Sequence, residues 1–493
     1  MKYNSFFELA KKFNFVPVYE NIAADLLTPV LAYLKIRKEN STSFLLESVE
    51  GIGRLARYSF IGLNPSEIIS NFQSELIIKS FQDEERRKEN LFDFLKKKIA
   101  EFNYPHIDEL PYFTGGIVGY IGFENISLIE DVIKFTKEEN PIAPDSILGF
   151  YKTIIVFDHF KHQIILITNV DVTDKSNLQT KYNDAKEILK NLRTLLSRTL
   201  EYKSNFKISP SLLNKKDENN FCSLVEESKK NIFNGDVIQI VLSKRLEADF
   251  EGDTFNVYRA LRMINPSPYM YFMEFENDFR VIGTSPEDLL KVKNRKAEIL
   301  PIAGTRKRGK TDEEDLELEN ELLNDPKEIA EHVMLVDLAR NDLGRVCKYG
   351  TIKLSEQMKI NRFSHVMHIV SRVEGILRDD ADCIDALKAS FPAGTVSGAP
   401  KIRAIQLINE YEKLNRSVYA GAVGYIDFSG NLDMCIAIRT LFAKNKKIFW
   451  QAGAGIVADS KPELELKEIK NKSAVLLSAL KIAEVIDEDL DYR

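Results

Sequence analysis

The sequence predicts an α/β (α+β) fold in which helices cover antiparallel sheet, and two hairpins carry this prediction. Strand-like runs at 153–158 and 163–170 are separated by a short segment from His159 to His162, as in a hairpin. The apolar run 269–283 turns in the same way at its Glu-Asn-Asp segment, 276–278. Helical periodicity lies between and after the hairpins, and it predicts helices at 172–200, 221–234, 326–341 and 462–486.

Length and linker composition predict two domains. The chain of 493 residues is long enough to bury a large core. A polar segment at 202–220, which contains SPSLLNKKDENN, has the composition of an interdomain linker. The helix that follows it stops at Gly235, before a strand at 237–246. We expect an N-terminal domain at residues 1–200 and a second domain at residues 218–486.

Composition and charge exclude some classes of function. Apolar residues make up 44 % and charged residues 29 % of the chain, as in an ordinary folded protein. The net charge is −6, and lysines and arginines are spread among acids, so no basic stripe is present to bind nucleic acid. The cysteines are widely spaced and form no CxxC motif; they are expected to be free thiols in a reducing compartment and are Cys222, Cys347, Cys383 and Cys435.

The apolar runs are too short for membrane targeting. The first residues, MKYNSFFELAKKFNF, lack the continuous apolar stretch of a signal peptide. No run approaches the eighteen or so apolar residues that span a bilayer. A cytoplasmic protein without membrane contact is expected.

Two glutamate pairs share one spacing in the second half of the chain. Glu328 precedes Glu331 by three residues, as Glu465 precedes Glu468, each pair just inside a predicted helix. This spacing places both carboxylates of a pair on one helical face. If the two faces oppose each other, the four carboxylates converge, and such a cluster is tolerable only around a divalent cation such as Mg2+. The pattern is therefore a candidate metal site for an anionic substrate.

Helix capping is the alternative interpretation of these glutamates. Asp325, Pro326 and Glu328 have the order of an N-cap, a proline at N1 and a glutamate at N3, as in a capping box. In the second helix Ser460 and Glu463 have the spacing of an N-cap and an N3 glutamate, so Glu465 and Glu468 are not needed for capping. These two glutamates belong to a polar stripe that a solvent-exposed helix face would also explain. The stripe consists of Glu465, Glu468 and Lys472.

Two small-residue segments are candidates for ligand contact. The loop 392–401 leads into the helix KIRAIQLINEYEK, with Pro400 at the expected N1 position; helix capping and anion binding both explain it. The segment 453–458 matches GxGxxA, but the residues that follow break the pattern before any helix begins, so a dinucleotide site is rejected. Gly453 and Gly455 are instead expected to let the backbone approach a ligand.

Arg439 and His368 lie in expected strands. Alternation along DMCIAIRTL places Arg439 on one face with Asp433, Cys435 and Ala437. Small neighbours leave room for a carboxylate ligand beside the arginine, although a snorkelling side chain at a strand end would have the same pattern. His368 shares a strand face with Val370 and is either a structural residue or a base.

Taken in order, these segments resemble the chorismate-utilising enzymes, and among them those that make anthranilate. The resemblance covers nearly the whole chain. It rests on LLESVEGIGRLARYSFIG (45–62), NPSPYMYF (265–272), GTSPE (283–287), PIAGTRKRG (301–309), EIAEHVMLVDLARNDLGRV (328–346), FSHVMHIVS (363–371), AGTVSGAPK (393–401), YAGAVGY (419–425) and QAGAGIVADS (451–460). It implies two facing antiparallel sheets with helices outside.

The resemblance also implies roles for the candidate residues. Glu331 and Glu468 become ligands of Mg2+, with Glu328 and Glu465 in the same cluster, and the metal neutralises the ring carboxylate of chorismate. Glu287 matches a general acid for the departing ring hydroxyl, and His368 matches a histidine implicated in the later loss of pyruvate. The expected contacts of the enolpyruvyl carboxylate and its surroundings are Arg439, Tyr419, Gly453, Gly455, Thr395 and Lys472.

Two positions distinguish this activity from related ones. Gln239 stands where isochorismate and salicylate synthases carry a lysine base, and an amide cannot activate water. Ala303 stands where aminodeoxychorismate synthases typically carry a lysine nucleophile. The remaining route is direct attack of ammonia on the ring. No cysteine-histidine glutaminase signature is present, so ammonia is expected from a separate glutamine amidotransferase subunit (component II). Aminodeoxychorismate synthase and a non-catalytic chorismate- or tryptophan-binding protein are the alternatives.

Two further segments match the halves of a tryptophan pocket in the family. The first is LLES, with Glu47 and Ser48, and the second is NPSPYM, with Pro268, Tyr269 and Met270. Glu47 is expected to hold the ammonium group of tryptophan, and the second segment its indole ring. The resemblance therefore implies feedback inhibition by tryptophan at a site distinct from the glutamates. A simple strand edge is the alternative for LLES.

Overall fold

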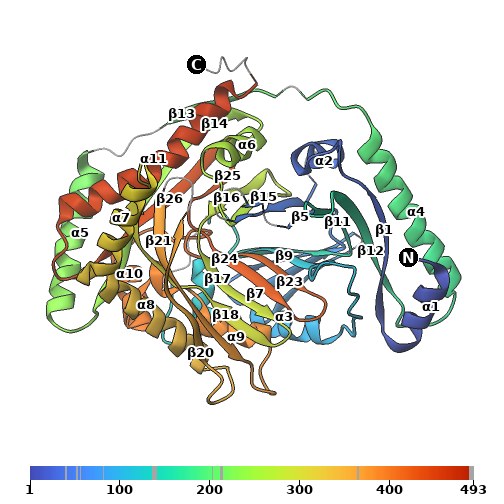
Figure 1. Ribbon diagram of the computed structural model, residues 1–493, viewed down its shortest axis with the longest axis horizontal. Coiled ribbons are helices and arrows are strands. Elements are labelled where there is room, and N and C mark those ends of the chain that lie inside the picture. The colour runs from blue at the N-terminus through green and yellow to red at the C-terminus, as the bar shows by residue number, and fades with distance from the viewer. Residues whose placement is uncertain are drawn as a thin grey trace.

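The computed structural model consists of two large antiparallel sheets with helices outside (Figure 1). It describes residues 1–38, 41–50, 54–55, 57–81, 83–135, 141–202, 204–210, 215–362 and 366–487. The first 12-stranded sheet has the order β1 (Phe15–Ala23), β12 (Gln163–Asp171), β11 (Thr153–Asp158), β5 (Tyr58–Leu63), β2 (Ser43–Glu47), β15 (Tyr269–Phe275), β16 (Phe279–Ser285), β25 (Thr440–Lys444), β26 (Lys447–Ile456), β14 (Gln239–Gly252) and β13 (Phe206–Pro210), with β22 (Gly398–Ala399) paired to β14.

The second sheet has the same number of strands in the described residues. Its order is β19 (Ile302–Lys307), β21 (Val366–Ile376), β18 (Lys296–Ile299), β17 (Asp288–Lys293), β24 (Leu432–Ile436), β23 (Ala422–Asp427), β9 (Gly116–Ile121), β10 (Ser146–Tyr151), β6 (Glu67–Phe72), β7 (Glu75–Ser80) and β8 (Glu84–Lys88), with β20 (Lys353–Arg362) paired to β21. A short ribbon joins β3 (Val49–Glu50) and β4 (Arg54–Leu55).

The described helices complete the list of elements. They are α1 (Tyr3–Lys12), α2 (Pro29–Ile36), α3 (Leu91–Ala100), α4 (Leu178–Ser197), α5 (Lys215–Phe233), α6 (Phe255–Ile264), α7 (Asp312–Asn324), α8 (Pro326–Gly344), α9 (Cys383–Ser390), α10 (Lys401–Tyr411) and α11 (Pro462–Val485), with 3-10 turns at Phe123–Leu128 and Gly394–Val396. None of these helices is long and apolar enough to cross a membrane.

Three apolar clusters define the layers. Between the sheets, Phe44 and Tyr271 of the first sheet belong to one cluster with Tyr120 and Val423 of the second, so the two sheets face each other. The outer face of the first sheet packs against α1, α2, α4, α6 and α11. The outer face of the second sheet packs against α3, α8 and α9. The expected architecture of two facing sheets flanked by helices is confirmed.

Strands from both halves of the sequence alternate within each sheet. In the first sheet β2 pairs with β15, which sets Glu47 opposite Met270. In the second sheet β9 pairs with β23, which sets Gly119 opposite Gly424. Part of the expected linker is the edge strand β13, paired with β14, while residues 211–214 lie outside the described residues. The division into domains at 1–200 and 218–486 stays a prediction.

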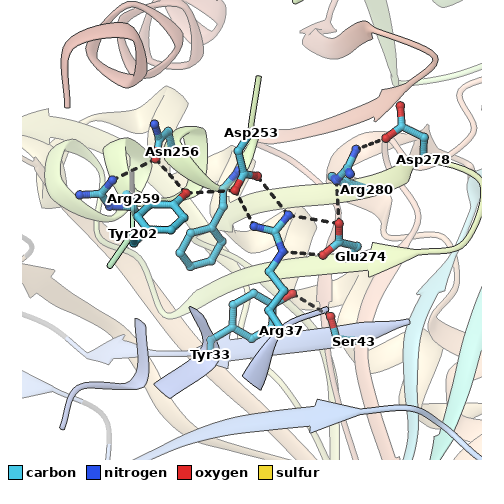
Figure 2. Close-up of polar contacts among 11 residues, drawn as sticks. Tyr33, Arg37, Ser43, Tyr202, Asp253, Asn256, Arg259, Glu274, Asp278 and Arg280 are labelled. Carbon is cyan, nitrogen blue, oxygen red and sulfur yellow. Dashed lines mark hydrogen bonds and ion pairs between the residues drawn. The ribbon is translucent and has the colours of Figure 1, made fainter. Parts of the chain in front are cut away.

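A buried ion-pair network joins the two halves beside the first sheet (Figure 2). The Arg37 guanidinium, just after α2, donates to Asp253 at 2.6 Å and to Glu274 of β15 at 2.7 Å. Arg280 of β16 donates to the other oxygen of Glu274 at 3.0 Å, and Tyr202 donates to Asp253 at 3.0 Å. The Glu274 side chain is only 1 % exposed, so losing Arg37 would leave this buried charge with Arg280 as its remaining ion-pair partner.

Local boundaries confirm some expectations and correct others. Both predicted hairpins form, and Asn277 and Asp278 adopt left-handed φ angles of 58° and 57° at the turn, which asparagine and aspartate tolerate well. Asp325 caps α8 through Lys327 N and Glu328 N, with Pro326 at N1, as predicted. Pro400 is the N-cap of α10 and not its N1 residue.

The capping box predicted for the last helix does not form. The N-cap of α11 is Lys461, which makes no side-chain cap. Ser460 lies one residue too early for that role, and its hydroxyl accepts from Val457 N at 3.1 Å instead.

Candidate active site

A cavity of about 380 Å3 collects most of the candidate residues. It lies where β14 and β26 of the first sheet meet β19 and β21 of the second, next to α8 and α11. Figure 1 shows β26, β21, α8 and α11 on the same side of the molecule. Glu328 and Glu465 do not line it. The predicted residues that do are Glu287, Glu331, His368, Thr395, Tyr419, Arg439, Gly453, Gly455, Glu468 and Lys472.

Glu287 has the properties of an acid that is protonated near neutral pH. It follows β16, and its backbone oxygen accepts from Ile436 N at 3.1 Å, which fixes the segment against the second sheet. Burial raises the pKa of Glu287 to about 7, although the Thr395 hydroxyl and the charges of Lys472 and Arg439 lower it in part. A large fraction of this carboxyl group therefore carries a proton at pH 7.

His368 lies on β21 and is held by a neighbouring strand. Its Nδ1 lies 2.9 Å from the carbonyl oxygen of Gly304 and 3.0 Å from the hydroxyl of Thr305. Because the carbonyl can only accept, Nδ1 carries the proton, and the lone pair of a neutral ring is on Nε2. Burial lowers the pKa of His368, and the Arg439 charge acts in the same direction, so the ring is neutral and has the form of a base.

Arg439 does not lie in a strand, contrary to the prediction. β24 ends at Ile436 in the second sheet and β25 begins at Thr440 in the first, so Arg439 lies in the crossover between the sheets. It has a left-handed φ of 50°, so strand alternation does not set its direction. Burial lowers the pKa of its guanidinium. No described residue forms an ion pair with this arginine, although it lines the cavity, which suits an anionic ligand.

The glycines of β26 are required by close packing. A Cβ atom at Gly453 would lie 2.6 Å from Tyr419 Oη, and one at Gly455 would lie 2.6 Å from Gln239 Nε2. Lys472 reaches over from α11, and its Nζ donates to the Gly453 carbonyl at 2.8 Å. Both glycines lie inside the strand and no helix opens within the motif, so the rejection of a dinucleotide fingerprint is confirmed.

The four glutamates lie on α8 and α11 as the helical spacing predicts. Burial raises the pKa of Glu331, and the charges of Glu328 and Glu468 raise it further. Burial also raises the pKa of Glu465; a hydrogen bond from Ser460 lowers it, and the Glu468 charge raises it again. These carboxylates are therefore close enough to repel one another across the two helices, and oxygen donors with excess negative charge fit a hard divalent cation.

Cations already partner two members of this group. Arg306 donates to Glu328 at 3.2 Å, and Lys472 forms an ion pair with Glu468. Across the described ranges, no three histidine, cysteine or acidic side chains are grouped tightly enough to hold a metal in this arrangement. Glu328 does not return a hydrogen bond to its N-cap, so the reciprocal half of the predicted capping box does not form.

Sequence reasoning missed several residues of the cavity. Asn265, Pro266 and Ser267, expected in the tryptophan pocket region, line the cavity instead. Gln451 also lines it and is 6 % exposed. Its alternation with Gly453 and Gly455 along one strand was the signal that could have identified it.

The residues of the expected tryptophan pocket line a second cavity, of about 270 Å3. They are Glu47, Ser48, Pro268, Tyr269 and Met270. The β2–β15 pairing brings the two segments side by side. The Glu47 carboxylate already accepts hydrogen bonds from Tyr258 and, at 3.1 Å, from Arg262, and Tyr269 donates to Asp433 at 2.8 Å. Pro268 lines both cavities.

Comparison with known proteins agrees with this arrangement. Residues 43–478 match the family model described as chorismate binding enzyme. Anthranilate synthase component 1 of Acetivibrio thermocellus is 44 % identical over 96 % of this chain and 97 % of that protein, and its counterpart in Aquifex aeolicus is 42 % identical over 98 % of each.

Solved structures lead to the same family. Anthranilate synthase component I from Streptococcus pneumoniae matches with a TM-score of 0.74 and 37 % identity, over 93 % of this chain and 99 % of that one. The menaquinone-specific isochorismate synthase from Escherichia coli shares the fold, with a TM-score of 0.70 and 19 % identity over 97 % and 99 % of the two chains. This chain therefore belongs to the chorismate binding enzymes and, within them, to the anthranilate synthase component 1 family.

Proposed function

We propose that this chain converts chorismate and ammonia to anthranilate and pyruvate, the first committed step of tryptophan biosynthesis, in the cytoplasm. The observation that carries the proposal is the pairing, in one cavity, of a carboxyl group with a pKa of about 7 and an arginine that no described residue pairs. The first is suited to protonate a leaving hydroxyl, and the second to hold a carboxylate.

Binding of the substrate divides between two ends of the cavity. Arg439, Tyr419 Oη and the backbone of Gly453 and Gly455 hold the enolpyruvyl carboxylate. Glu331 and Glu468, with Glu328 and Glu465 in the same cluster, would hold Mg2+, and Lys472 would then have to release its ion pair with Glu468. The bound metal would supply positive charge for the ring carboxylate of chorismate.

Two side chains move protons. Glu287 gives its proton to the ring hydroxyl as ammonia forms the new carbon–nitrogen bond, so the hydroxyl leaves as water. His368, neutral and with its lone pair on Nε2, is positioned for the proton that the ring loses as pyruvate departs and the ring becomes aromatic. The low pKa of this histidine supports its use as a base at neutral pH.

The cavity lacks a group that a related activity requires. Ala303 of β19 lines the cavity and carries no amine, which disfavours the covalent route of aminodeoxychorismate synthase. Ammonia would come from a glutamine amidotransferase subunit, as the component 1 name of the relatives suggests. Tryptophan would bind in the second cavity, and because Pro268 borders both cavities, occupancy of one is expected to bias the geometry of the other.

One assay tests the proposal. The purified chain is incubated with chorismate, Mg2+ and ammonium, and anthranilate is followed by its fluorescence. We expect anthranilate with ammonium at alkaline pH, none with glutamine alone, and glutamine use once the amidotransferase is added. A para-amino product would indicate aminodeoxychorismate synthase, and chorismate binding without turnover would indicate a binding protein.

A further inference from the structure

A chain of buried hydrogen bonds leads from the protein interior to the wall of the active-site cavity. Arg416, 1 % exposed, donates to both oxygens of Glu412 at 2.8 Å. Glu412 Oε1 accepts from the Ser243 hydroxyl at 2.8 Å and from Ser243 N at 2.7 Å. Gln451 Nε2 donates to Ser243 Oγ at 2.7 Å. The chain thus ends at the side chain of Gln451.

Proton counting fixes the orientation of the Gln451 amide. The Ser243 hydroxyl has a single proton, and the carboxylate of Glu412 is its stronger acceptor. Toward Gln451 the serine oxygen can therefore only accept, so the amide NH2 group faces Ser243. The carbonyl oxygen, Oε1, faces away from this chain and is buried without a hydrogen-bond partner among the residues that the structure describes.

Gln451 lies on the strand face that borders the active-site cavity. Gln451 shares one face of β26 with Gly453 and Gly455, the face that lines the cavity. Leaving a buried acceptor unpaired costs about 1 to 3 kcal/mol, so such a group is normally matched by a donor. The carboxylates of chorismate offer no donor at pH 7, and its ring hydroxyl is the group assigned above to Glu287. Ammonia offers three N–H bonds.

The neutrality of the amide suits ammonia as a nucleophile. Only NH3 has the lone pair that forms the new bond, and a carboxylate beside it would favour NH4+ instead. Glu331 and Glu468 therefore could not hold ammonia without deactivating it. A carboxamide oxygen accepts a hydrogen bond but adds no net charge. Arg416 and Glu412 fix the position of this oxygen indirectly, because they hold Ser243, which accepts from the Gln451 amide.

On the basis of the proposed function, we infer that Gln451 Oε1 accepts a hydrogen bond from the attacking ammonia, and that Ser243 and Glu412 are positioning residues for it. The ammonia lone pair forms the bond to the ring carbon, and the ring hydroxyl leaves as water with the proton of Glu287. The nitrogen, then an ammonium, returns one proton to Glu287. One water is released, and the acid is restored.

Substitution of Gln451 tests the inference through the two substrate constants. In Gln451→Met the side chain keeps its length but loses the acceptor, and we expect the KM for NH3 to rise about tenfold while the KM for chorismate changes less than about twofold. Ser243→Ala releases the amide from its fixed orientation and should raise the KM for NH3 by about threefold. Gln357→Met, on the exposed face of β20, is the matched control and should behave as wild type.

The outcomes separate this inference from the function on which it rests. An unchanged KM for NH3 in Gln451→Met, or equal increases in both KM values, overturns the role of Gln451 and leaves anthranilate formation standing. If the wild-type chain itself forms no anthranilate from ammonium, both are overturned. If Gln451→Met fails to fold, Ser243→Ala decides: a selective rise in the KM for NH3 supports the inference, and none refutes it.

Discussion

Tyr419 occupies the space that a side chain at Gly453 would need: an added Cβ atom would lie 2.6 Å from Tyr419 Oη and 3.0 Å from the Leu242 carbonyl oxygen. The strand and the tyrosine can approach each other only because Gly453 has no side chain. This contact places a hydroxyl group and a backbone edge side by side on the cavity wall.

Gly453→Ala is therefore expected to displace the Tyr419 ring and weaken chorismate binding. We predict a rise of about tenfold in the KM for chorismate, with a cost of about 1 to 3 kcal/mol in stability from overpacking. Steady-state kinetics and urea unfolding measure the two effects. Gly344→Ala, where the nearest atom would be an ordinary 3.8 Å away, serves as the control. A normal chorismate KM in Gly453→Ala would show that the contact is unimportant for binding.

Replacing Glu331 or Glu468 by glutamine should remove metal-dependent turnover without unfolding the protein. Each change keeps the size of the side chain but removes a charge, and we expect turnover at limiting Mg2+ to fall by about a hundredfold or more. Because burial, and then the neighbouring carboxylates, raise the pKa of Glu331, its neutral replacement should leave the melting temperature unchanged or slightly higher. Calorimetric titration with Mg2+ measures metal binding, steady-state kinetics measure turnover, and thermal unfolding measures the melting temperature. Glu463→Gln, exposed on the same helix, is the control; wild-type activity of Glu468→Gln would refute the metal assignment.

The raised pKa of Glu287 predicts a pH-dependent stability effect. The pKa of this carboxyl is about 7 in the folded chain and about 4.3 when unfolded. Its contribution to stability is therefore full below pH 4 and is lost as the pH rises through 7. Glu287→Gln, which cannot ionise, should be more stable than wild type by about 3 kcal/mol at pH 8. At pH 5 the difference should be much smaller.

Urea unfolding at the two pH values measures this difference, and the same variant should have lost most of its turnover. Equal stability differences at pH 5 and pH 8 would mean that Glu287 is ionised throughout and is no general acid.

Ser48→Phe is expected to fill the second cavity and relieve inhibition by tryptophan. The cavity measures about 270 Å3, so a phenyl ring in it leaves no room for an indole. The concentration of tryptophan that halves activity should rise by about tenfold or more, while turnover of chorismate stays nearly constant. Ser197→Phe, at the exposed end of α4, controls for added surface area. If millimolar tryptophan does not inhibit the wild-type protein, the assignment of the second cavity as a tryptophan site is refuted.

Local patterns predicted those elements whose side chains alternate or repeat along a single segment. The hairpin at 269–285 was identifiable because its turn consists of residues that accept left-handed angles, and the glutamate pairs because i, i+3 spacing fixes a helical face. Arg439 was misplaced for the converse reason. The apolar alternation continues from β24 into β25, although the chain leaves one sheet and enters the other between them, and alternation carries no signal of that change.

Contacts between distant segments were outside the reach of local reasoning. Nothing in the spacing of Ser243, Glu412 and Gln451 relates them, because they meet only once β14, β26 and the end of α10 have packed together. The Arg37 network is similar, since its acids come from the other half of the sequence. Family resemblance supplied the tryptophan segments, and only the β2–β15 pairing explains why they adjoin.

The pairing of early strands with late ones also determines when each sheet can be completed during synthesis. When the ribosome has made β2 and β9, their later neighbours β15 and β23 do not yet exist, so each nascent sheet keeps one open edge with unpaired backbone groups. At roughly 5 to 20 residues per second, these edges wait on the order of ten seconds or more for their partners. The emerging chain is therefore expected to depend on chaperones, or on slow and late closure of both sheets, to escape edge-to-edge association.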